Sequence, residues 1–174
     1  MPLLEGEEGL RHLMLGNNLI RKIDHLVSLP NLQTLDLSGN KLAEINNFWL
    51  PGSNLDKLRC LVLARNQIRQ IRNLEKLVGL ERLDLSDNRV VELSGLQRVQ
   101  GLKVLNLSGN MIEFLDLPCE MKNLQELNLR KNKITIVNKI GTPNLQKLNL
   151  GFNQIKSIAN LENTLPCLRD LTLD

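Results

Sequence analysis

Two histidines and three cysteines are the side chains of this 174-residue chain that point most directly to catalysis or metal binding. A nucleophilic enzyme needs a serine or cysteine within reach of a general base that a third group orients. His12 falls close to Asp36 in the repeat described below, but no serine or cysteine completes a triad with them, and His25 belongs to a different part of the repeat. Neither a glycine-rich phosphate loop nor a cluster of metal ligands is present. The sequence therefore predicts that the chain is not an enzyme and holds no metal or cofactor.

The cysteines do not suggest a disulfide framework or a zinc site. Cys60, Cys119 and Cys167 are far apart, odd in number and without a CxxC pair. Arg59 and Arg82 fall near Cys60 in the repeat, and their charges favour the reactive thiolate. We favour the other interpretation, in which Cys60 is a small apolar side chain that fills space.

Composition and hydropathy indicate a soluble globular domain. The chain has 42% hydrophobic and 24% charged residues with a net charge of +3, and only 2% aromatic residues, so its core must be aliphatic. No apolar stretch approaches the ~20 residues that span a bilayer, and the start, MPLLEGEEGL, lacks the basic and apolar segments of a secretory signal. We expect a cytoplasmic protein with no membrane partner; a nuclear location is the alternative.

One pattern, LxxLxLxxN, organises almost the whole sequence. Its eight copies, the last incomplete, begin at Leu10, Leu32, Leu58, Leu80, Leu102, Leu124, Leu145 and Leu168. The ninth position is asparagine in every complete copy, namely Asn18, Asn40, Asn66, Asn88, Asn110, Asn132 and Asn153. We therefore interpret residues 1–174 as a single domain of about eight repeats.

The spacing within a repeat predicts an α/β solenoid. LxL alternation gives one short strand per repeat, with both leucines on the same side. Stacked repeats then form a parallel sheet with strands ~4.8 Å apart, in which each leucine packs on its equivalents. Apolar residues at spacings of three after each asparagine predict short helical turns on the opposite, convex side. The asparagine amide is expected to hydrogen-bond backbone groups of its own and adjacent turns.

The extended motif LxxLxLxxNxIxxIxxLxxL, which spans residues 10–174, resembles the leucine-rich repeat. It is most similar to the 22-residue class typified by a regulatory subunit of the type-one protein phosphatase. Tubulin-folding cofactors, a spliceosomal ribonucleoprotein component, an axonemal dynein light chain and many centrosomal or ciliary proteins share this class. The resemblance implies a curved solenoid whose concave sheet binds another protein.

Three features depart from the regular repeat. The second repeat is four residues longer than the usual 22, within residues 46–57, where Trp49 either anchors a partner or covers a local gap. Pro118, Cys119, Thr142 and Pro143 replace leucines of the outer side. The chain also stops in its eighth strand without a capping segment, so it is either part of a longer protein or associates with itself through its uncapped ends.

The residues between the strand leucines must lie on the concave face, and we predict that a partner protein binds there. This face is mixed in sign and has no aromatic residue in its central column. The resemblance implies an acidic and aromatic concave face in the phosphatase-binding member, so a phosphatase partner is disfavoured. The predicted protein-binding residues are Met14, Asp36, Arg59, Val62, Arg82, Asp84, Asn106, Asn128 and Asn149.

Basic residues gather beside the asparagine column. The positions one before, one after and three after each asparagine carry a net charge of +6, against +3 for the whole chain. The principal members of this basic edge are Arg21, Arg65, Arg69, Arg89, Lys131 and Lys133. An acidic partner segment, such as a tubulin tail, or RNA phosphates would be attracted to it, and a solvated edge without a partner is the third interpretation.

We therefore predict a noncatalytic scaffold that binds a protein on its concave face, in a cytoskeletal, centrosomal or ciliary assembly. This setting follows from the family resemblance alone. A ribonucleoprotein scaffold that uses the basic edge and a phosphatase regulatory subunit are the alternatives. Nucleic acid is the less favoured ligand because sequence-selective RNA binding needs stacking aromatics, and only Phe152 stands beside the basic residues.

Overall fold

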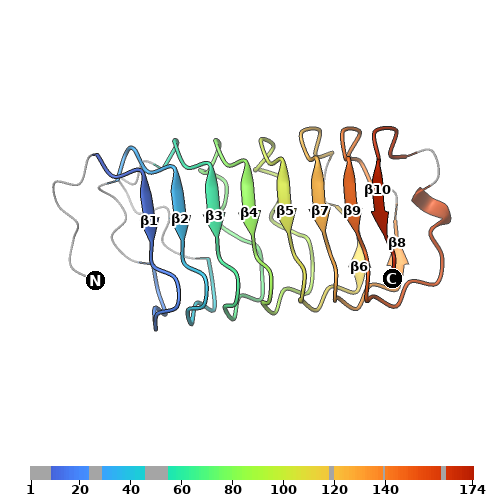
Figure 1. Cartoon of the computed structure of the whole chain (residues 1–174), viewed down its shortest axis with the longest axis horizontal. Helices are drawn as coiled ribbons and strands as arrows, with labels where there is room; N and C mark the ends of the chain where they lie inside the picture. The colour runs from blue at the N-terminus through green and yellow to red at the C-terminus, as the bar shows by residue number, and fades with distance from the viewer. Residues whose placement is uncertain (1–8, 24–28, 46–54, 118–119, 139, 162–163) are drawn as a thin grey trace.

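The computed structural model describes residues 9–23, 29–45, 55–117, 120–138, 140–161 and 164–174. Its main element is a parallel sheet of eight three-residue strands that lie side by side in chain order (Figure 1). The strands are β1 (His12–Met14), β2 (Thr34–Asp36), β3 (Cys60–Val62), β4 (Arg82–Asp84), β5 (Val104–Asn106), β7 (Glu126–Asn128), β9 (Lys147–Asn149) and β10 (Asp170–Thr172). Each begins two residues after a repeat leucine, so the predicted parallel solenoid is confirmed.

The sheet register aligns equivalent positions of neighbouring repeats. Leu61 pairs with Leu83 and Leu83 with Leu105, and the flanking residues follow the same offset. The central leucines of β2 to β9 are buried, with at most 2% of their surface exposed. Because each strand buries one face on an aliphatic core, a shift of one residue would place these leucines in water. The repeat period therefore fixes the register.

The convex side is built from turns. Leu77 N–H donates to the Leu74 carbonyl and Leu80 N–H donates to the Leu77 carbonyl, each at 3.0 Å, and these three leucines are buried. Such β-turns keep the apolar spacing of three without a helix. Among the described residues, the predicted helical turns occur only as the 3₁₀ segment η1 (Ala159–Leu161), so that part of the prediction is wrong.

A second, two-stranded parallel sheet follows the asparagine column in two neighbouring repeats. It pairs β6 (Phe114–Leu115) with β8 (Ile136–Val137), and Figure 1 shows it behind the main sheet. Leu115 and Val137 are buried, while Phe114 and Ile136, which face each other in the register, are exposed. This pair places two large apolar side chains together on the surface.

The asparagine column forms a ladder of buried amides. The Asn88 side chain donates to the carbonyls of Leu85 and Ser86 in its own repeat and of Leu63 in the preceding one, at 2.9–3.1 Å. Its oxygen accepts the backbone N–H of Ile68 at 3.0 Å. The same four contacts recur at Asn40, Asn66, Asn110, Asn132 and Asn153. The predicted role of this column is confirmed.

The residue before each ladder asparagine has a left-handed backbone. Its φ is between 52° and 67° in all seven complete repeats, at Asn17, Gly39, Arg65, Asp87, Gly109, Lys131 and Phe152. Only Gly39 and Gly109 adopt this conformation without steric cost. Arg65 and Lys131, two predicted basic-edge residues, therefore project from tight turns at the ends of the strands.

Three of the irregular positions lie outside the described residues, namely Trp49, Pro118 and Cys119. The interpretations of the Trp49 segment thus stay predictions. Thr142, in contrast, is completely buried, and its hydroxyl is the one buried side-chain polar atom in the described part of the chain without a hydrogen-bond partner. In the last repeat Leu171 and Leu173 are exposed, and β10 is the outermost strand of the sheet in the described residues.

Candidate protein-binding surface

The concave face is formed by the first and third residues of each strand, whose side chains point away from the buried leucines. In the register Met14 lies beside Asp36, Asp36 beside Val62, Val62 beside Asp84 and Asp84 beside Asn106. Asn128 and Asn149 continue the row. The fold therefore brings the central members of the predicted site into one row, one residue per strand.

Most of the polar side chains in this row are held by their own backbone. One oxygen of each accepts an N–H two residues later, as Asp84 does from Ser86 at 2.8 Å. The same turn forms at Asp36 (2.8 Å), Asn106 (3.2 Å), Asn128 (3.1 Å) and Asn149 (3.0 Å). Because one oxygen of each side chain is held by this hydrogen bond, the orientation of the side chain on the sheet is fixed before a partner binds. The sequence pattern alone did not show this preorganisation.

The row changes character along the sheet. Asp36 and Asp84 present carboxylates, whereas Asn106, Asn128 and Asn149 present amide groups. The Asn106 amide donates to the second carboxylate oxygen of Asp84 at 3.2 Å, which couples the two halves. A hollow of ≈ 320 Å³ lies over β5, β7, β9 and β10 and is lined in part by the three amides. Carboxylates, which only accept hydrogen bonds, thus lie over the earlier strands, and amides, which both donate and accept, lie over the later ones.

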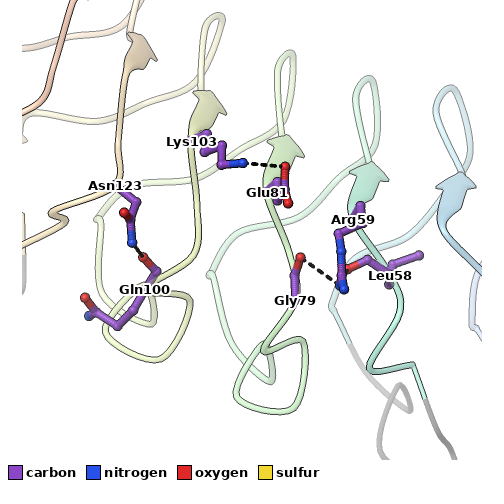
Figure 2. A network of polar contacts seen from close by, with 7 residues as sticks. All are labelled: Leu58, Arg59, Gly79, Glu81, Gln100, Lys103 and Asn123. Atoms are coloured by element: carbon purple, nitrogen blue, oxygen red, sulfur yellow. Dashed lines mark hydrogen bonds and ion pairs between the residues drawn. The ribbon is translucent and has the colours of Figure 1, made fainter.

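Oppositely charged side chains join adjacent strands at the rim of the sheet. Lys103 Nζ lies 2.9 Å from Glu81 Oε2 (Figure 2), and Lys147 Nζ lies 3.1 Å from Glu126 Oε1. The hydrogen bond from Lys103 lowers the pKa of the Glu81 carboxyl. The positive charges of Lys103, Arg59 and Arg82 lower this pKa further. These pairs remain in contact with solvent, so they contribute little to stability and mainly order the surface charges.

Arg59 has a structural contact that the sequence did not indicate. Its Nη1 donates to the Asp56 carbonyl at 2.9 Å. It also donates to the Gly79 carbonyl at 3.1 Å and thereby ties two repeats together (Figure 2). A Cβ atom on Gly79 would collide with this guanidinium group and with the Asp56 backbone. Arg59 therefore acts at the rim of the concave face as a clamp between repeats, whereas Arg82 stays exposed on β4.

The cysteine, histidine and carboxylate side chains described on this face do not form a reactive centre. Burial raises the pKa of the Cys60 thiol, outweighing the opposite effect of Arg82, and the carboxylates Asp36 and Asp84 raise it further. The surroundings of Cys60 therefore disfavour its reactive thiolate form. His12 pairs with Thr34 in the register, and Asp36 with Met14. In the described ranges, no three His, Cys, Asp or Glu side chains are grouped as a metal site requires.

The basic edge divides into separate groups. Arg69 and Arg89 line a groove on the side of the solenoid that follows the strands, whereas Arg65 and Lys131 occupy the left-handed turns. Arg21 and Lys133 are likewise exposed. Phe152, the aromatic residue noted beside these charges, carries the Arg130 guanidinium 4.2 Å from its ring centroid. One face of its ring is therefore already occupied.

The stacked repeats and their open parallel sheet identify the chain as a solenoid repeat protein. The family model for Leucine Rich repeats (2 copies) matches residues 8–48, 56–98 and 100–140, and that for a single Leucine Rich repeat matches residues 142–157. The chain belongs to the leucine-rich repeat family. No curated protein matches the chain. No described helix is long and apolar enough to cross a membrane.

Solved structures of several different proteins share this fold. An internalin, InlF, from Listeria monocytogenes is 26% identical, with a TM-score of 0.74 over 94% of this chain and 47% of its own. The leucine-rich repeat domain of APL1B is 27% identical, with a TM-score of 0.75 over 90% and 45%. A TLR13 complex with ssRNA13 is 26% identical, with a TM-score of 0.74 over 96% and 29%. The chain thus spans less than half the length of these three proteins.

Proposed function

We propose that this protein is an interaction scaffold that binds a partner protein on its concave face. The observation that carries the proposal is the row from Asp36 to Asn149, in which side chains fixed by their own backbone lie one strand apart on an open sheet. Rigid polar groups lose little conformational entropy on binding and impose a defined orientation on the partner. The leucine-rich repeat fold, typical of protein-binding scaffolds, supports the same conclusion.

The partner that fits this face is polar and of mixed charge. It would present donors or cations to Asp36 and Asp84, and acceptors to the amides of Asn128 and Asn149. Val62 and Met14 add small apolar contacts to the same row. The cytoskeletal, centrosomal or ciliary setting, and membership of the 22-residue class, are supported by the resemblance of the repeat motif and remain part of the proposal.

A pull-down from cytosol with two matched charge reversals tests this function. Asp84→Arg changes the centre of the concave face, whereas Glu75→Arg makes the same change at an exposed position of the convex side. We expect specific partners to be lost with Asp84→Arg and kept with Glu75→Arg. Partners that bind all three forms equally would refute concave-face binding.

RNA binding at the basic edge is a second candidate function. The exposed positions of Arg65 and Lys131, and the similarity to the TLR13 structure that contains ssRNA13, favour it. Retention on RNA at low salt that disappears with Arg65→Glu plus Lys131→Glu would support this candidate. An absence of RNA retention at low salt would exclude it.

A further inference from the structure

A second surface, distinct from the concave face, combines positive charge with exposed apolar side chains. It lies on the side of the solenoid that follows the strands, where a groove of ≈ 1100 Å³ runs across the second to fifth repeats. Three arginines, Arg69, Arg72 and Arg89, line it together with Val91 and Met111. We call this surface the flank groove.

The arginines of the flank groove are free to bind an anion. None of the three ion pairs found among the described residues involves them. The groove lining contains one carboxylate, that of Glu44, against the three guanidinium groups. The groove therefore has a positive field, and its concave shape strengthens the attraction of a negatively charged segment.

The apolar side chains lie toward the later repeats. Val91 is 50% and Met111 42% exposed, although both are large and apolar. Phe114 and the groove residue Gln70 occupy equivalent positions in repeats that lie two apart. Phe114 also pairs with Ile136 in the sheet formed by β6 and β8. Phe114 is 52% and Ile136 48% exposed. An apolar strip therefore continues the groove beyond its basic part, and the exposed carboxylates of Glu92 and Glu113 follow Val91 and precede Phe114 in the sequence.

The geometry points to a docking site for an extended acidic peptide segment of a partner protein, in which carboxylates contact Arg69, Arg72 and Arg89 and adjacent apolar residues contact Val91, Met111 and Phe114. The span from the third to the sixth repeat is about 14 Å at ~4.8 Å per strand, which four or five extended residues cover. A hollow site of this length fits a peptide better than a flat bilayer. This inference goes beyond the proposed concave-face function and does not depend on it.

A fluorescein-labelled peptide of four glutamates followed by Gly, Leu, Phe and Leu is a suitable probe, with binding measured by fluorescence anisotropy at low salt. Arg69→Glu plus Arg89→Glu is expected to weaken binding at least tenfold, and Val91→Ser plus Met111→Ser at least threefold. The matched control, Arg65→Glu plus Lys131→Glu, makes the same charge change on the basic edge outside the groove, and should weaken binding less than threefold. Unchanged circular dichroism and thermal midpoints identify the variants that remain folded.

Equal weakening by the groove and control pairs would overturn the proposal, because it would reduce the interaction to general charge attraction. Binding to vesicles of phosphatidylserine and phosphatidylcholine, without binding of the peptide, would overturn it in favour of a membrane surface. Asp84→Arg should leave the affinity for the peptide within twofold. A loss with that variant would contradict the separate location of the groove. Failure of the peptide to bind wild-type protein at low salt would overturn the groove proposal and leave the concave-face proposal standing.

Discussion

The side-chain amide of Asn88 donates a 2.9 Å hydrogen bond to the backbone carbonyl of Leu63, 25 residues earlier in the chain. The two residues belong to consecutive repeats, and the bond is buried. Each repeat is therefore tied to the next by a polar contact as well as by its leucines. Since the same bond recurs along the ladder, these amides hold the strands, and with them the concave face, in a fixed arrangement.

Asn88→Ala should lower the free energy of unfolding by about 2–4 kcal/mol, because it leaves several buried backbone groups without partners. Urea denaturation followed by circular dichroism measures the change. Asn18→Ala is the matched control, since Asn18 begins the ladder, is exposed, and within the described ranges bonds only to carbonyls of its own repeat. A loss of stability at Asn18 as large as that at Asn88 would contradict the role of the contacts between repeats.

Gly95→Ala should destabilise the protein by more than about 2 kcal/mol. The residue has a φ of 91°, and an added Cβ would collide with the Ile71 carbonyl of the preceding repeat. For a chain of this size each kcal/mol corresponds to roughly 2–4 °C in Tm, so a thermal melt resolves the effect. Gly101→Ala, whose Cβ would come no nearer than 3.3 Å to another atom, should change Tm much less. Equal shifts would argue against the collision.

Thr142→Val should stabilise the protein by about 1 kcal/mol, because valine has nearly the shape of threonine and removes a buried hydroxyl without a partner. Thr142→Ser keeps the hydroxyl, loses a methyl group and should destabilise. Parallel urea titrations of the two variants give the comparison. A Thr142→Val protein less stable than wild type would mean that the hydroxyl is satisfied in solution.

The carboxyl group of Glu81 should titrate below the usual range of glutamate, because the hydrogen bond from Lys103 favours its ionised form. Since the folded-state pKa is the lower one, any stabilisation from this pair is present at neutral pH and is lost as pH falls through that pKa. Carbon-detected NMR of the glutamate side chains follows the titration. Lys103→Met should raise the pKa of Glu81, whereas Lys76→Met should leave it unchanged; no response to Lys103→Met would contradict the pairing.

The parts of the structure that the sequence predicted are those repeated in every copy. Leu83 and Asn88 recur with a fixed period, so their burial and contacts follow from stacking alone. Turns and short helices both satisfy an apolar spacing of three, and for this reason the convex side was mispredicted around Leu74 and Leu77. Contacts that occur in one copy of the repeat and not in the others were also missed.

The clamp of Arg59 illustrates such a contact, because it depends on the space left at Gly79, which a repeat pattern does not encode. The flank groove is a second example. Its apolar strip joins Met111 and Phe114, residues at different positions of one repeat, with Ile136 of the next. A search for large apolar residues at repeat positions that are otherwise polar would have found Phe114 and Ile136.

The most direct test of the central claim is to locate the partner on the surface by site-specific photo-crosslinking. A benzophenone amino acid at Val62 probes the concave face, and the same residue at Lys76, which is exposed on the convex side, is the control. We expect the partner captured by wild-type protein to crosslink from position 62 and not from position 76. Crosslinks from position 76 with none from position 62 would contradict binding on the concave face.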